Sequence, residues 1–274
     1  LYFGHRCERY DQVTASGRDE ILDGVQKRHE LINAYAHSSQ TADSQTMQIG
    51  LPRCLFFQEW LPFFSTLFSE LGLEVVCSES TTRKQISIGS ERMATEACLP
   101  MKAAHGHVQD LIAKGVTTIF LPQVRELPAW PGSNQTGNIC PYVQSLPWVI
   151  RSAFALDTKG ISLLSPVLRL SNGVTEDQRQ WKDLARSLNL PWQRMRKALD
   201  RAAQAQREFA ARLREYGQQI LQRVEAGERA VLLIGRPYNA LDPGMNMNVP
   251  AKLRKLGMPT IPLDCLPLDE AGQD

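Results

Sequence analysis

Length, composition and charge exclude several classes of function. The chain has 274 residues, of which 43% are hydrophobic and 22% are charged, and its formal net charge is +2 at pH 7. That length allows two domains with real cores, and the charge is too small to indicate nucleic acid or an anionic membrane as a partner. No apolar run approaches the ~20 residues that span a bilayer, and no secretory signal is recognisable, so we expect a cytoplasmic protein.

The first 46 residues are predicted to precede the folded units. Residues 1–5, Leu-Tyr-Phe-Gly-His, look like the remnant of a cleavable purification tag and are left out of the fold prediction. Residues 6–46 are polar and predict an extension or linker that contains one helix from 20 to 36.

Residues 47–170 predict a first lobe in which strands alternate with helices. Alternation at this spacing requires crossover connections, and therefore a mostly parallel sheet that is covered on both faces. Glycines at 72 and 115 are placed to end the helices. The predicted strands are 48–51, 73–77 and 116–121. One predicted helix begins near Pro62, and a second covers residues 100–114.

Residues 171–227 predict a helical connector, and residues 228–274 predict the start of a second lobe. From Trp192 onward apolar side chains recur at three- and four-residue steps, which is typical of a long amphipathic helix. The second lobe has the expected order of strand, helix and strand, with too few strands for a full sheet. The predicted fold class is α/β, with two Rossmann-like lobes of mostly parallel sheet joined by a long helical segment.

Two of the six cysteines, Cys98 and Cys140, each stand one or two residues ahead of a proline. Proline suits the first turn of a helix, so each sulfur is predicted to lie at a helix N-terminus, on the side of the sheet where the strands end. That end favours anions, and two thiolates there are what a metal or iron–sulfur centre needs. The alternative is two buried, reduced cysteines. The other cysteines form no C-x-x-C pair, which disfavours a disulfide framework and a zinc finger.

Several sequence blocks in a fixed order resemble one family. They are Ile-Gly-Leu-Pro-Arg at 49–53, Leu-Gly-Leu-Glu-Val-Val at 71–76, Cys-Leu-Pro-Met-Lys-Ala-Ala-His-Gly-His at 98–107, Ile-Phe-Leu-Pro at 119–122, Cys-Pro-Tyr-Val at 140–143 and Gly-Arg-Pro-Tyr-Asn at 235–239. Over residues 47–270 the chain resembles the C-terminal region of 2-hydroxyacyl-CoA dehydratase activators, also called CoA-substrate-specific enzyme activases. This region looks related to the dehydratase and benzoyl-CoA reductase subunits, in which paired lobes hold a 4Fe-4S cluster.

The resemblance implies a site and a set of partners. Cys98 and Cys140 match cysteines that such proteins use as cluster ligands, so they are the expected metal ligands. Cys265 is the only second-lobe candidate for a further ligand, with a buried strand-end thiol as the alternative. The implied role is low-potential electron transfer or activation of 2-hydroxyacyl-CoA dehydration, together with an ATP-hydrolysing activase domain or subunit, a dehydratase or reductase, or acyl-CoA. The rival hypothesis is a metal-free regulatory or docking domain. Oligomerisation stays open.

Three further side chains are candidates for cofactor binding. Lys102, four residues past Cys98, is placed to offset cluster charge or to meet a CoA phosphate, and its alternative is a solvated lysine. His105 lies on the apolar face of its helix, so a core histidine competes with a role near the cluster. Arg236 follows a strand and could reach an anion between the lobes or pair with an acid such as Asp242. No Asp-x-Gly-Gly-Thr turn or Walker loop occurs, so this piece alone should not hydrolyse ATP.

Overall fold

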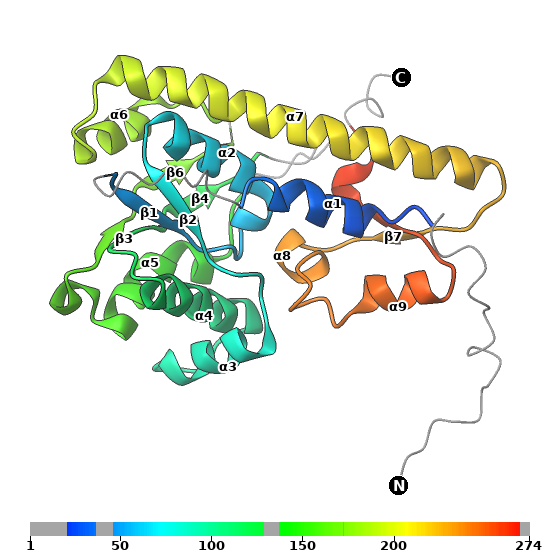
Figure 1. Cartoon of the computed structure of the whole chain (residues 1–274), viewed down its shortest axis with the longest axis horizontal. Coiled ribbons are helices and arrows are strands. Elements are labelled where there is room, and N and C mark those ends of the chain that lie inside the picture. The colour runs from blue at the N-terminus through cyan, green and yellow to red at the C-terminus, as the bar shows by residue number, and fades with distance from the viewer. Residues whose placement is uncertain (1–20, 37–45, 129–136, 172, 269–274) are drawn as a thin grey trace, which may run out of the picture.

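The computed structural model describes residues 21–36, 46–128, 137–171 and 173–268 (Figure 1). The tag-like residues 1–5 and most of the predicted 6–46 extension lie outside the described residues. In the part that is described, no helix combines the length and the apolar character needed to cross a membrane.

The first lobe is built on a four-stranded parallel sheet, as the alternation of strands and helices predicts. The strand order is β2-β1-β3-β5, with Gly50 of the central strand β1 paired to Val76 on one side and to Ile119 on the other. Figure 1 shows α2 and α7 on one side of this sheet and α3, α4 and α5 on the other. The strands are β1 (Gln48–Leu51), β2 (Glu74–Cys77), β3 (Thr118–Phe120) and β5 (Ser162–Leu164).

Helix α2 (Phe57–Glu70) begins five residues before the predicted start at Pro62, which lies inside the helix. A proline has no N–H, so it leaves the carbonyl of residue i−4, here Gln58, without its helical donor. The fully buried guanidinium of Arg28 replaces that donor, because its Nη2 lies 2.5 Å from the Gln58 oxygen. The helix therefore continues through Pro62 with the help of a side chain from a distant segment.

Helices α3 (Arg83–Arg92) and α4 (Leu99–Ala113) cross so closely that only glycine fits at the contact. A Cβ at Gly89 would lie 1.8 Å from the carbonyl oxygen of Lys102, and a Cβ at Gly106 would lie 2.1 Å from that of Gln85. The periodicity did not predict α3, although Thr82 and Gln85 form a capping box at its start.

The rest of the first lobe follows α4 along the chain. A second, two-stranded parallel sheet extends the strands of the first lobe, and α5 packs against β4 and α4. Pro191 separates α6 from α7, so the predicted helical connector is two helices. These elements are β4 (Gln123–Glu126), α5 (Pro141–Phe154), η3 (Leu156–Lys159), β6 (Val167–Arg169) and α6 (Gln178–Ser187).

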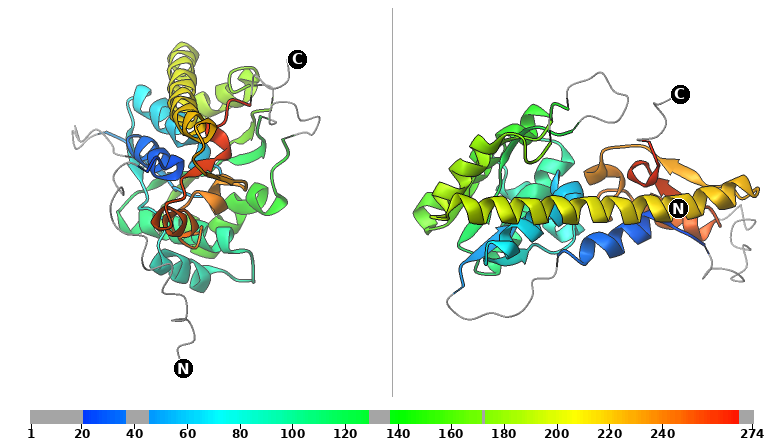
Figure 2. Two further views of the ribbon diagram at one scale, coloured as in Figure 1. Left: turned by 90° about the vertical axis from the view of Figure 1, so that its right-hand side faces the viewer. Right: turned by 90° about the horizontal axis from the view of Figure 1, so that it is seen from above.

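Helix α7 (Trp192–Glu225) runs along both lobes, as the top view in Figure 2 shows, and packs against α1, α2 and η4. Helix α1 (Gly24–Asn33) lies within the predicted extension. It belongs to the core, because its N-cap Asp23 accepts a hydrogen bond from Thr260 of β8 at 2.8 Å. The second lobe has β7 and β8 as a parallel pair, which matches the predicted strand, helix and strand. Its elements are β7 (Val231–Leu233), α8 (Pro237–Ala240), α9 (Val249–Lys255), β8 (Thr260–Pro262) and η4 (Leu263–Cys265).

Candidate functional site

Cys98 and Cys140 are the N-cap residues of α4 and α5, and each is followed by a proline in the first helical turn. Both residues have extended ψ angles, 157° for Cys98 and 131° for Cys140, so the chain turns into the helix directly after each thiol. Cys98 is exposed and Cys140 is partly exposed. Helix N-termini carry unpaired N–H groups and a partial positive charge, which stabilise an anion placed there. The prediction that each sulfur lies at a helix N-terminus is confirmed.

Burial and nearby charges act on Tyr238 of the second lobe. Tyr238 is half-buried, and burial raises the pKa of its hydroxyl; the charge of Arg236 lowers this pKa, while charge on Cys140 and Cys98 raises it. Helix α4 also packs against α5, which brings their N-termini to the same side of the sheet.

Two charged residues, Glu59 and Arg236, act on this tyrosine. Burial raises the pKa of Glu59, near the start of α2, to about 7, whereas the positive charges of Arg28 and Arg236 act in the opposite direction. Arg236 is the N-cap residue of α8, and this helix, which contains Tyr238, packs against α2 of the first lobe. A carboxyl group that titrates near neutral pH is suited to exchanging a proton at this position.

Three other candidates from the sequence, Lys102, His105 and Cys265, have the following surroundings. Lys102 forms an ion pair with Glu96 at 2.8 Å on the protein surface. His105 is fully buried, its Nδ1 lies 2.8 Å from the Met101 carbonyl, and burial lowers its pKa. Cys265 is fully buried where η4 packs on α7, and burial raises the pKa of its thiol.

A metal ion would need more ligands than these two cysteines provide. Within the residues that the structure describes, no three His, Cys, Asp or Glu side chains come together as a metal-binding group. Cys98 and Cys140 would each offer a thiol, a donor that suits iron or another soft metal. Neither Tyr238 nor Glu59 was among the candidates from the sequence. Tyr238 lies within the Gly-Arg-Pro-Tyr-Asn block, which echoes Gly-Leu-Pro-Arg of the first lobe and could have drawn attention to it.

Comparisons with known proteins give one family and no individual relative. A family model described as "CoA enzyme activase uncharacterised domain" matches residues 48–266, which is most of the chain. No curated protein and no solved structure matches the chain. The matched range includes both thiols, Tyr238 and the whole of α7.

Proposed function

Since the chain belongs to the family of CoA enzyme activase domains, we propose that it holds a 4Fe-4S cluster through Cys98 and Cys140. The observation that carries the proposal is that both thiols are accessible N-cap residues of two helices, α4 and α5, which pack against each other. Cysteine thiolates are the usual ligands of such clusters, and a 4Fe-4S cluster takes four ligands. The two thiols would supply half of the ligand set, and the rest would come from other groups.

When bound, the cluster would supply an electron at low potential for activating a 2-hydroxyacyl-CoA dehydratase or a related reductase. The chain's own residues would stabilise the thiolates. The N-termini of α4 and α5 favour the anionic sulfurs, and Arg236 adds positive charge to the same region. Tyr238 of α8 stays protonated, because its pKa is raised, and its hydroxyl remains a hydrogen-bond donor. An ATP-hydrolysing activase domain or subunit would be the electron-transfer partner, and acyl-CoA would reach the site through the dehydratase or reductase.

The test is iron and sulfide analysis of the chain after anaerobic reconstitution. Wild-type protein should turn brown, and Cys98→Ser and Cys140→Ser should each lose most of the iron. Cys77→Ala is the matched control, because Cys77 is a buried thiol at the end of neighbouring strand β2 and should leave the iron content unchanged. Colourless wild-type protein without iron would refute the proposal.

One observation favours a second candidate, a metal-free docking domain. Beside Cys140, helix α5 exposes two large aromatic side chains, Tyr142 at 59% and Trp148 at 55%. Exposed aromatic residues are typical of protein interfaces. If wild-type protein binds no iron but Trp148→Ala weakens its binding to the ATP-hydrolysing partner, the docking function is the better description.

A further inference from the structure

A chain of buried polar side chains crosses from the first lobe to the loop that carries Arg236 and Tyr238. We call it the Asp242 network; its members are Gln58, Ser78, Thr81, His107 and Asp242. They come from α2, from the segment that follows β2, from α4 and from the segment that follows α8. All five are buried, with His107 at 0% and Asp242 at 2% exposure.

Asp242 is held by three hydrogen bonds. Its Oδ2 accepts from Thr81 Oγ1 at 2.5 Å and from Gln58 Nε2 at 2.9 Å, and its Oδ1 accepts from the Gly244 N–H at 2.8 Å. Two of the three donors belong to the first lobe. Asp242 therefore links the first lobe to the segment that follows α8. Separating the two would leave a buried carboxylate without hydrogen-bond donors, which is energetically costly.

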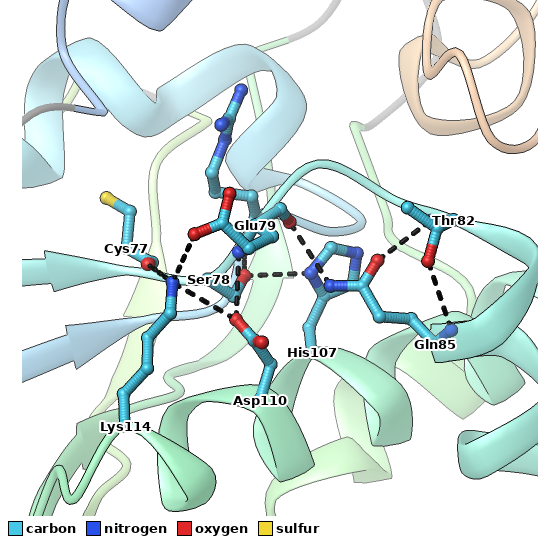
Figure 3. A network of polar contacts seen from close by, with 9 residues as sticks. Cys77, Ser78, Glu79, Thr82, Gln85, His107, Asp110 and Lys114 are labelled. Atoms are coloured by element: carbon cyan, nitrogen blue, oxygen red, sulfur yellow. Dashed lines mark hydrogen bonds and ion pairs between the residues drawn. The ribbon is translucent and has the colours of Figure 1, made fainter.

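The directions of the hydrogen bonds are fixed along the network. Thr81 donates its only hydroxyl proton to Asp242, so its oxygen must accept from His107 Nε2, which lies 2.9 Å away. His107 therefore carries its proton on Nε2, and its Nδ1 accepts from Ser78 Oγ at 2.8 Å, the contact drawn in Figure 3. Ser78 in turn accepts from the backbone N–H of Arg53 at 2.8 Å. Burial lowers the pKa of His107 to about 3, so the ring stays neutral and keeps this tautomer.

The first-lobe end of the network is itself held in place. Lys114 Nζ bonds the Cys77 carbonyl at 2.9 Å and Glu79 at 2.8 Å, and Asp110 accepts from the Glu79 N–H at 2.9 Å (Figure 3). These contacts fix the segment around Ser78 on α4. The loop that carries Asp242 lies close against that segment, because a Cβ at Gly244 would come within 2.4 Å of the Thr81 carbonyl oxygen.

We propose that Asp242 is a positioning residue, which holds α8, and with it Tyr238 and Arg236, against the first lobe that carries Cys98 and Cys140. Asp242 follows α8 directly and lies four residues past Tyr238, so its anchor fixes the end of that short helix. A second contact acts at the same point, because His29 Nε2 lies 2.5 Å from the Leu241 carbonyl. The role of Tyr238 and Arg236 near a cluster rests on the proposed function. The hydrogen bonds of Asp242 do not, because they are present in the chain without metal.

The test is hydrogen exchange of the metal-free chain, with Thr81→Val as the main variant. Valine keeps the shape of threonine but removes the hydroxyl that joins Asp242 to His107. Exchange of the backbone amides in 238–242 should speed up about tenfold or more, as expected when a hydrogen bond to a charged group is lost, while β3 should exchange at the wild-type rate.

Two other variants separate positioning from general destabilisation. Thr81→Ser keeps the hydroxyl and should restore wild-type exchange, and Ser80→Ala changes an exposed neighbour and should have no effect. Should Thr81→Val fail to fold, Gly244→Ala replaces it, because its methyl group pushes the same loop away from Thr81. Unchanged exchange in 238–242, or equal acceleration in β3, would overturn the proposal. Iron content of the wild type is measured separately, so its absence would count against the cluster and leave the exchange result decisive.

Discussion

Replacing Gly106 by alanine should destabilise the fold, although alanine is the better helix former. The new methyl group would lie 2.1 Å from the Gln85 carbonyl oxygen, well inside the 3.0 Å that real Cβ atoms keep. The obstacle is backbone, so α3 must shift by about an ångström. Helix propensity favours alanine by about 1 kcal/mol, whereas overpacking typically costs about 1–3 kcal/mol or more. The clash wins, and we expect a net loss of about 1–2 kcal/mol, or a fall in Tm of roughly 2–8 °C.

The assay is urea unfolding followed by circular dichroism. Gly89→Ala should shift the midpoint in the same direction, because its methyl group would meet the Lys102 carbonyl from the other helix. Ala113→Gly, at the exposed end of α4, measures the difference in helix propensity between alanine and glycine without any clash. If Gly106→Ala raised the midpoint by the amount that propensity predicts, the close crossing of α3 and α4 would be refuted.

Two further predictions concern charge between the lobes. Burial raises the pKa of Glu59 to about 7, above its value in the unfolded chain. Below about pH 4.5 the carboxyl group is protonated in both states and does not change the free energy of unfolding. As the pH rises past 7, ionisation of the buried group lowers the free energy of unfolding by up to about 3 kcal/mol. Glu59→Gln should flatten unfolding free energy against pH in that window, whereas Glu70→Gln, at the exposed end of α2, should not; equal curves for both variants would contradict the assignment. Arg28→Met should cost about 3 kcal/mol by leaving Asp264 without its 2.7 Å partner, and Arg28→Met with Asp264→Asn should recover part of the loss in the same urea assay.

The sequence predicted the first lobe well, because its signals are local. Strands β1 and β2 follow from short apolar runs, and the two helix starts at the cysteines follow from proline in the first turn. The predicted start of α2 near Pro62 was wrong. The prediction assumed that a proline marks the beginning or end of a helix, and it took no account of the hydrogen bond from Arg28. That side chain is 30 residues away from Gln58 and supplies the hydrogen-bonding partner that makes an internal proline tolerable.

The site was predicted only in part, for a similar reason. The helix caps placed Cys98 and Cys140 correctly, but the importance of Tyr238 and Glu59 depends on how the lobes meet. Cys265 shows the converse: its place in the second lobe made it a candidate, and tertiary packing buries it against Gly217 of α7, where a Cβ would lie 1.9 Å from the Cys265 carbonyl. Pairings between segments that lie more than 150 residues apart, such as Thr81 with Asp242, leave no periodic trace in the sequence.

The 34 residues of α7 make a rod of about 50 Å that contains no proline. Both lobes are fastened to this one rod, through α2 at one end and through η4 at the other. If the two lobes moved towards each other around a ligand, α7 would have to bend. A continuous helix without proline resists a sharp bend. The relative placement of the two lobes would therefore be set during folding, and the proposed anchor at Asp242 would then hold Tyr238 within a frame that does not close.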